Sequence, residues 1–474
     1  LGGVEAVWGL RQIYGLAVSN HSLYALTGSF YNPGPYSGYL AITLPVALGI
    51  LLEQSKRNMP YYLSMGCIGT AIVVLPAGMS RSAWIAVVVS CAWVYALYRL
   101  DRKQAATRLR QHKRWYIIGG ILGGILLLGG SASLYTLKKD SADGRFLMWK
   151  ITTKAIQKQP ITGTSLGGFP AAYAETQAEY MASGKATEQE KLVAGCPEYA
   201  FNEYLQIGLE QGLVGLALFI GWLGLLFYKG IKNKRYACCG GLMSLAIFAF
   251  SSYPLQLPEF WVVLIFLGVM SVTPDKDEIR ENQAESNGHR WGKQIFFMGI
   301  AILGIGLFWM QKDHYKAYQQ WNKAQMYYKN KAYEAALEVY EPLYPLLKHK
   351  PEFLFEVAQC LSKTGRYEKA NGYLERAVLL SSDPMLYYVM AKNEQCLGEY
   401  RQAEKHLLHA IDILPERIYP YYLLMNLYTE PSYFQPAKLK MAIDSVLTKK
   451  PKVESSAIKE MKEKARSMLN NTSI

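Results

Sequence analysis

Long apolar runs fill the chain up to about residue 310 and are absent from the remainder. Eight runs stand out, at 38–53, 61–78, 83–99, 116–135, 205–228, 237–253, 258–273 and 294–310. Each is long enough, or nearly long enough, to cross the hydrocarbon core of a bilayer as a helix. This pattern predicts an all-α protein, with a polytopic helical membrane domain of about eight spans over residues 1–311 and a separate domain over residues 312–474.

The basic residues account for the net charge of +14 and orient the predicted spans. They gather in alternate short loops, and the loop between the third and fourth spans carries Arg99, Arg102, Lys103, Arg108, Arg110, Lys113 and Arg114. Basic loops of this kind lie on the cytoplasmic side of a membrane. The outer side is then expected to hold 28–37, 78–82, the large loop 136–204, 253–258 and everything after residue 311. Charge distributed in this way argues for a membrane and against a nucleic-acid partner.

An aromatic residue and an alanine three positions later recur through the C-terminal domain. The pairs are Tyr333 and Ala336, Tyr367 and Ala370, Tyr400 and Ala403, and Phe434 and Ala437, at spacings of 34, 33 and 34 residues. A period near 34 is typical of tetratricopeptide repeats, in which the small residue lets two helices approach closely. Such repeats stack into an α-solenoid with a concave surface for partners. We therefore expect a protein partner on this domain, and a polar capping helix over residues 455–469.

The chain begins with Leu1 rather than methionine, so we expect further helices upstream in the complete protein. It has seven cysteines and seven histidines, without CxxC or CxxH spacing, and no histidine lies within 136–204. Metal sites are usually recognisable from such clusters. We therefore expect neither a metal nor another cofactor.

Two arginines are predicted on the outer side, where positive charge is unusual. Arg81 lies between the second and third spans, and Arg145 lies early in the long outer loop. One interpretation is that each side chain simply reaches lipid headgroups or solvent. The other is that both bind an anion, since a guanidinium group binds phosphate oxygens through two parallel hydrogen bonds.

Polar side chains also precede the fifth span. Glu198, Asn202 and Glu203 come first, and the segment then runs without a break into an apolar helix over 213–227. Asn and Glu favour helix starts, so helix capping is one interpretation. The other is catalytic, because a carboxylate at the membrane boundary can accept a proton from an attacking hydroxyl group. The sequence leaves both interpretations open.

Several segments together resemble the O-antigen ligase and polymerase superfamily, bacterial membrane glycosyltransferases of the GT-C type. The matching pieces are Gly28-Ser-Phe-Tyr-Asn-Pro33, Tyr39-Leu-Ala41, Ser80-Arg-Ser-Ala-Trp84, Gly144-Arg145 with Trp149 and Pro160-Ile-Thr-Gly163, and Asn202-Glu-Tyr-Leu-Gln206 with Gly212-Leu-Val-Gly215. They cover about residues 5–270 in the family's order. Each piece is loose alone, whereas the ordered set on a matching topology is fairly specific, and some members carry an added repeat domain.

The resemblance implies transfer of a glycan on the outer face of the bacterial inner membrane, with the C-terminal domain in the periplasm. The donor would be a sugar chain on undecaprenyl pyrophosphate, and the acceptor a hydroxyl group on lipid A-core, on a growing glycan or on a protein. Arg81 and Arg145 match the family's two outer arginines and would offset the growing charge of the pyrophosphate. Asn32 and Trp149 lie in matching segments and are weaker substrate-binding candidates.

The chain departs from the family at Phe201. Many ligases have His-Asn at the position occupied here by Phe201-Asn202, and phenylalanine cannot accept a proton. Either Glu203 or Glu198 then replaces the base beside Asn202, or the chain follows a polymerase-like variant, or it has lost activity. A carboxylate needs only a modest rise of its pKa through partial burial to serve as a base.

Other functions stay open beside the ligase or polymerase. A protein O-oligosaccharyltransferase would use the same site with a different acceptor. A non-catalytic scaffold that recruits envelope-assembly proteins through its repeats is consistent with the missing histidine, although Arg81, Arg145 and Asn202 are retained. A transporter is disfavoured, because no span carries a buried acid–base relay and no inverted repeat is evident.

Overall fold

The computed structural model describes residues 1–54, 57–101, 139–274, 290–451 and 453–471. All regular elements among these residues are helical, which confirms the predicted all-α class. Contacts divide the chain into two compact units. We call residues 1–142, 160–163 and 199–285 the membrane unit, and residues 143–159, 164–198 and 286–474 the repeat unit.

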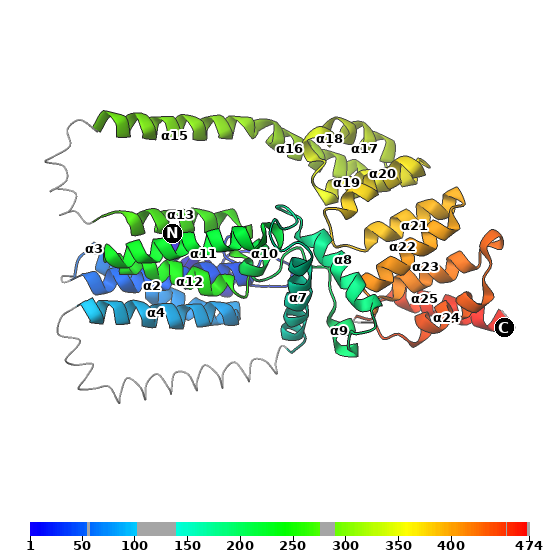
Figure 1. The fold of residues 1–474 in the computed structure, drawn as a ribbon, viewed down its shortest axis with the longest axis horizontal. Coiled ribbons are helices and arrows are strands. Elements are labelled where there is room, and N and C mark those ends of the chain that lie inside the picture. The colour runs from blue at the N-terminus through cyan, green and yellow to red at the C-terminus, as the bar shows by residue number, and fades with distance from the viewer. Residues whose placement is uncertain (55–56, 102–138, 275–289, 452, 472–474) are drawn as a thin grey trace. The chain divides into compact units, whose positions relative to one another are not determined.

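The membrane unit is a helical bundle (Figure 1). Its described elements are α1 (Gly2–Ile13), α2 (Pro33–Glu53), α3 (Met59–Val74), η1 (Leu75–Gly78), α4 (Arg81–Asp101), α10 (Glu203–Glu210), α11 (Gly212–Lys232), α12 (Tyr236–Ala249), η2 (Pro254–Gln256) and α13 (Pro258–Val272). Helices α2, α4 and α12 pack against one another. The Ser244 hydroxyl group donates to the Ala41 carbonyl at 2.7 Å, and a Cβ on Gly49 would lie 2.5 Å from Ala237. Small side chains thus let α12 approach α2 closely, and the core forms around α2.

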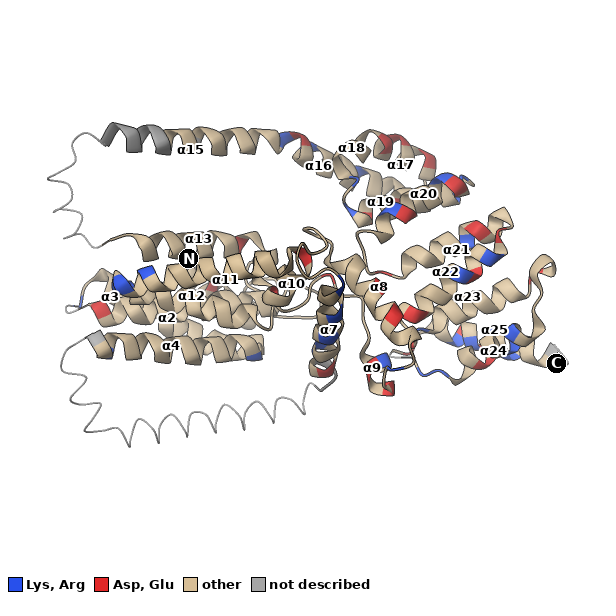
Figure 2. Cartoon of the chain, in the orientation of Figure 1, with Lys and Arg blue, Asp and Glu red and all other residues tan. Residues whose placement is uncertain are grey.

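Apolar helices form at each predicted span that lies within the described residues. Four are long and apolar enough to cross a membrane, namely α2, α3 with η1, α4 and α11, while α12 and α13 are shorter apolar helices. In the repeat unit, α15 (Arg290–Met310) covers the predicted eighth span. Figure 2 shows few charged side chains along α2, α12 and α13. The predicted span 116–135 lies outside the described residues. The chain is therefore a multi-pass membrane protein.

The prediction of one continuous helix at the fifth span is wrong, because the helix breaks at Gly212. Helix α10 ends at Glu210 and α11 begins at Gly212, whose φ of +70° lies in the left-handed region that favours glycine. A Cβ at this position would lie 1.9 Å from the carbonyl oxygen of Ile161. The Leu213 amide also donates to the Pro160 carbonyl at 2.8 Å. The turn after Pro160 therefore packs into the break.

The repeat unit contains part of the long loop as well as the repeats. Its described elements are most of α7 (Lys139–Lys158), α8 (Phe169–Ala182), α9 (Glu188–Val193), α15, α16 (Lys312–Lys329), α17 (Tyr333–Tyr340), η3 (Glu341–Leu343), α18 (Tyr344–Leu347), α19 (Pro351–Lys363), α20 (Tyr367–Val378), α21 (Met385–Leu397), α22 (Tyr400–Ile413), α23 (Ile418–Tyr428), η4 (Pro431–Tyr433), α24 (Pro436–Thr448) and α25 (Ser456–Asn471). The sequence predicts a domain boundary at residue 311, where the last predicted membrane span ends. The division by contacts instead places α15 and most of the loop with the repeats.

The first three predicted repeat pairs pack as the spacing indicates. Ala336, Ala370 and Ala403 are completely buried, and α19 packs with α20 as α21 packs with α22. The fourth pair does not pack in this way, since Phe434 is 52% exposed and Ala437 is also exposed. The reason is that α24 begins only at Pro436, so Phe434 lies in extended backbone before the helix. The predicted polar cap is present as α25.

The long loop packs firmly on the repeats through α8. This helix lies against α22. The buried Gln177 side chain donates to the Ile413 carbonyl at 2.8 Å and to the Gly195 carbonyl at 3.0 Å, and its Oε1 accepts from the Tyr173 hydroxyl group at 2.7 Å. Buried amides with every hydrogen bond satisfied specify one packing arrangement. Residues 164–198 therefore behave as part of the solenoid.

Candidate functional site

Tyr253 joins three segments at one end of the membrane unit. Its hydroxyl oxygen accepts a hydrogen bond from Asn32 Nδ2 at 3.3 Å. Its ring stacks on Tyr199 at a centroid distance of 5.2 Å and meets the Phe201 ring edge-on at 4.9 Å. We call Asn32, Tyr199, Phe201 and Tyr253 the Tyr253 cluster. It holds together the start of α2, the approach to α10 and the turn after α12.

Phe201 has an unusual backbone conformation that fixes the start of α10. Its φ of +49° lies in the left-handed region, which costs a residue with a Cβ about 1–2 kcal/mol. On either side the backbone is held, because the Ala200 amide donates to Gln206 Oε1 at 2.8 Å and the Leu205 amide donates to Asn202 Oδ1 at 3.1 Å. Asn202 is only 4% exposed. In this structure Asn202 caps the helix.

Glu203 is the first residue of α10 and is 1% exposed. Its Oε1 accepts from the Leu255 amide at 2.6 Å, and its Oε2 accepts from Gln256 Nε2 at 3.0 Å. The carboxylate thereby holds η2 against α10. Burial raises the pKa of Glu203 to about 7; the two hydrogen bonds lower it less, and the nearby Glu210 raises it further. Since α10 precedes the span α11, this carboxylate lies outside the membrane-spanning helices.

Arg81 is the first residue of α4, and a tight turn holds it beside the start of α2. In this turn Met79 has a φ of +47°, and a Cβ on Gly78 would lie 2.0 Å from Ser37 Oγ. The first backbone amides of this 21-residue helix have no partner within the helix and carry partial positive charge. The guanidinium group and the helix terminus together favour an anion at this position.

A cavity of about 390 Å³ adjoins the Arg81 turn. It is lined by Ser82, Ile85, Tyr204, Ala246, Ile247, Phe250 and Ser251. Ser82 directly follows Arg81, and Tyr204 directly follows Glu203. Most of the lining side chains are apolar. An apolar cavity beside a cationic helix start is suited to an amphiphilic molecule with an anionic head.

Two predicted site residues lie on α7 in the repeat unit. Arg145 is partly exposed, and Trp149 packs edge-on against Phe146 with ring centroids 5.9 Å apart. An ion pair between Lys150 and Glu190 at 2.7 Å joins α7 to α9. Arg145 and Trp149 are thus carried by the part of the long loop that belongs to the repeat unit.

Glu198 also belongs to the repeat unit, although it is only five positions from Glu203. It is exposed and lines a cavity of about 760 Å³ together with repeat residues. The candidates therefore fall into two groups. Asn32, Arg81, Asn202 and Glu203 belong to the membrane unit, and Arg145, Trp149 and Glu198 belong to the repeat unit.

Sequence reasoning missed the residues of the turn after α12. Tyr253 connects the Tyr253 cluster, and Leu255 and Gln256 bind Glu203. One indication that these residues contribute to the site is present in the sequence. Both 253–258 and the start of α10 are predicted to lie on the outer side of the membrane. Within the described ranges, no group of three or more His, Cys, Asp or Glu residues could hold a metal ion.

Two family models match parts of the chain. The model described as O-antigen ligase matches residues 66–220, a range that includes Arg81, Arg145 and Glu203. The model described as anaphase-promoting complex, cyclosome, subunit 3, which is of the tetratricopeptide type, matches residues 329–410, from the end of α16 into α22. No curated protein matches the chain.

Proposed function

Because the chain joins an O-antigen ligase domain to a C-terminal tetratricopeptide-like repeat domain, we propose that it transfers a glycan from an undecaprenyl-pyrophosphate donor to an acceptor hydroxyl group on the outer face of the inner membrane. The match to the O-antigen ligase model over residues 66–220 supports a glycosyltransferase of the O-antigen ligase and polymerase type. The donor, the acceptor and the membrane face are parts of our proposal.

The observation that carries the proposal is that Ser82, the residue after Arg81, lines the apolar cavity of about 390 Å³. A polyprenyl pyrophosphate has an apolar tail and a dianionic head. The cavity offers apolar walls such as Ile85 and Phe250, and the Arg81 turn offers a guanidinium group and the start of α4. Guanidinium groups and helix starts are the common protein ligands of phosphate oxygens. We therefore assign the cavity to the lipid tail and Arg81 to the diphosphate.

The proposed reaction is a displacement at the anomeric carbon of the donor sugar. The acceptor oxygen forms a bond to this carbon, and the bond between the carbon and the pyrophosphate oxygen breaks. The lipid pyrophosphate leaves with the electron pair, and in our proposal Arg81 offsets its added negative charge. Arg145, the predicted second ligand of the pyrophosphate, belongs to the repeat unit, and its role stays a prediction. Asn32 and Trp149 stay weaker candidates for substrate binding.

In our proposal the proton of the acceptor hydroxyl group goes to Glu203. A pKa of about 7 leaves much of this carboxylate ionised at neutral pH and makes it a stronger base than an ordinary glutamate. Both of its oxygens accept hydrogen bonds from η2 in this structure. Each oxygen keeps a further lone pair for the acceptor, but the carboxylate is only 1% exposed. A neighbouring group must therefore move when the acceptor binds, and the Gln256 side chain is more easily displaced than the Leu255 backbone amide. Asn202 keeps α10 in place beside it.

The orientation of the membrane helices gives a direct test of the proposed membrane face. We place the basic loop 229–235 in the cytoplasm and the C-terminal domain in the periplasm. Protease added to spheroplasts should therefore remove an epitope tag fused after Ile474. A tag inserted after Asn233 is the matched control and should survive until the cells are lysed. The opposite pattern would invert the orientation and exclude transfer on the outer face.

Deletion of the gene, followed by gel profiling of lipopolysaccharide, capsule and glycoproteins, tests the function itself. We expect the loss of one of these products and its restoration by the intact gene, and the product that is lost identifies the acceptor. A change confined to glycoproteins would favour the protein O-oligosaccharyltransferase, our second candidate, because a repeat domain of the tetratricopeptide type is suited to a protein partner. Unchanged profiles of all three products would contradict transfer and favour an envelope-assembly scaffold.

A further inference from the structure

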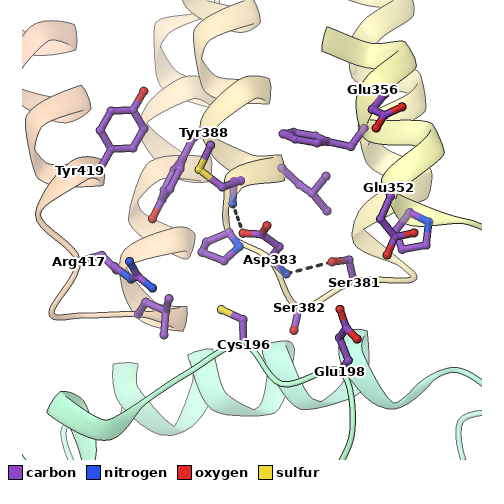
Figure 3. A pocket seen from close by; sticks show the side chains of 16 residues that line it. Cys196, Glu198, Glu352, Glu356, Ser381, Ser382, Asp383, Tyr388, Arg417 and Tyr419 are labelled. Carbon is purple, nitrogen blue, oxygen red and sulfur yellow. Dashed lines mark hydrogen bonds between the residues drawn. The ribbon is translucent and has the colours of Figure 1, made fainter. Parts of the chain in front are cut away.

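The cavity of about 760 Å³ in the repeat unit has no part in the proposed transfer reaction. Helices α19, α21 and α23 and the turns before them supply most of its wall, and Cys196 and Glu198 of the long loop complete it (Figure 3). The Ser382 hydroxyl group donates to the Pro197 carbonyl at 3.1 Å, which joins the loop to the turn before α21. The repeats and the loop therefore build this site together.

The wall of this cavity contains a buried hydroxyl group without a partner. Tyr388 is 4% exposed, and its hydroxyl group makes no hydrogen bond with any described residue. Leaving a buried polar group unsatisfied costs about 1–3 kcal/mol, and such groups are rare in folded proteins. The Tyr388 ring is itself well fixed, since it packs edge-on against Tyr419 at 5.3 Å. A ligand that supplies a hydrogen-bond acceptor would remove this cost.

Charges of opposite sign lie on opposite sides of the cavity. Arg417 lies on the same side as Tyr388, and Glu198 and Glu352 lie on the other (Figure 3). All three charged side chains are exposed, and among the described residues none of them makes a side-chain hydrogen bond or an ion pair. They differ in this from Glu356, which accepts from Trp321 Nε1 at 2.7 Å and from other neighbours. Asp383 also lines the cavity between these two sides (Figure 3), and its Oδ1 accepts from the Met385 amide at 2.9 Å. The cavity thus offers one arginine at one end and, at the other, two carboxylates without a side-chain partner among the described residues.

We propose that this cavity binds an extended peptide segment of a partner protein that carries one acidic and one basic side chain. The acidic group meets the Arg417 guanidinium group and accepts the hydrogen bond of the Tyr388 hydroxyl group. The basic group meets the carboxylates of Glu198 and Glu352. The rings of Phe355 and Tyr419, which also line the cavity, contact the apolar part of the segment between the two charges.

Charge complementarity selects this occupant over the alternatives. A neutral oligosaccharide could fill the volume, but it would leave Arg417 and the two carboxylates without partners. A wholly acidic segment would be repelled by Glu198 and Glu352, and a wholly basic one by Arg417. Peptide binding here does not depend on glycan transfer, so it is measured without a donor.

The test is selection of peptides from a randomised display library on the full chain in lipid nanodiscs. We expect the selected peptides to contain an acidic and a basic position at a constant separation. Fluorescence anisotropy with a selected peptide then gives the affinity of each variant. Arg417→Gln and the double variant Glu198→Gln/Glu352→Gln should each weaken binding by about tenfold or more. Tyr388→Phe, which removes only the hydroxyl group, should weaken it by about fivefold.

Matched controls separate this cavity from general charge effects. Arg401→Gln and Glu368→Gln change exposed residues of α22 and α20 that are outside the cavity, and both should leave the affinity unchanged. Selected peptides without a preference for paired opposite charges would overturn the proposal. So would full affinity in both cavity variants, or displacement of the peptide by a neutral oligosaccharide such as maltohexaose. Thermal unfolding of each variant confirms that the repeats remain folded.

Discussion

Replacing Arg81 with glutamine should lower glycan transfer about a hundredfold or more while the protein stays in the membrane. The pyrophosphate gains negative charge as the sugar–phosphate bond breaks, and removal of one fixed donor to such a charge typically costs about 10²–10³ in rate. The close approach of Gly78 to Ser37 fixes the backbone of the turn, so we expect the turn to survive the substitution. We therefore expect a loss of rate without a loss of folding, measured as surface glycan in a complemented deletion strain.

Two further variants make the Arg81 result specific. Arg99 lies exposed at the other end of the same helix, and its Nε donates to the Tyr95 hydroxyl group at 2.8 Å, so Arg99→Gln should transfer glycan at the normal rate. Arg81→Lys should recover only part of the activity, because an ammonium group keeps the charge but cannot form two parallel bonds. Full transfer by Arg81→Gln would remove Arg81 from the site and leave the cavity without an anion ligand.

The sequence predicted the elements that depend on local pattern. The lengths of the apolar runs predicted the positions of the described spans. The small residues Ala336, Ala370 and Ala403 predicted where the helices of the repeats pack closely. In each case the physical cause lies within a few residues of the element itself. The fourth repeat failed for a local reason as well, because Pro436 delays the start of α24 and leaves Phe434 exposed.

The features that the sequence could not predict are set by contacts between distant segments. The helix breaks between Glu210 and Gly212, where Gly212 has a φ of +70° and the backbone of Ile161 leaves no room for a Cβ. Glu203 is buried because the turn after α12 folds over it and donates two hydrogen bonds. Glu198 is a close neighbour in sequence, yet it packs with the repeats through the Pro197 carbonyl. The polarity of the sequence therefore predicts both Glu198 and Glu203 as candidates. Only the fold shows that Glu203 is buried in the membrane unit and that Glu198 belongs to the repeat unit.

Glutamine in place of Glu203 should abolish transfer and leave the protein at least as stable as before. The glutamine carbonyl oxygen can still accept from the Leu255 amide, so the contact with η2 is retained. Glutamine cannot take the acceptor's proton, and loss of a general base lowers rates by about 10²–10⁴. Glu210→Gln is the matched control, since Glu210 is also buried at the end of the same helix. This variant should retain transfer, with a somewhat lower pKa of Glu203 because the charge of Glu210 is removed.

The pH dependence distinguishes a base from a purely structural carboxylate. Glu203 has a pKa of about 7 in the folded chain and 4.5 without burial. The folded state therefore holds this proton more tightly, and stability falls as the pH rises between these values. The cost reaches about 3 kcal/mol above neutral pH. Thermal unfolding of the Glu203→Gln variant should lack this fall, and the wild-type transfer rate should rise as the pH passes about 7.

The assignment of Glu203 as the base predicts that stability falls while the transfer rate rises with increasing pH. A residue whose only role is to hold η2 could be a glutamine, which accepts the same backbone hydrogen bond without the cost of a buried charge. A carboxylate at this position destabilises the fold in the pH range in which it can accept a proton. Such a trade of stability for reactivity is expected at an active site. A Glu203→Gln variant that transfers glycan at the normal rate would show that the carboxylate only positions the turn, and the base would then have to lie elsewhere.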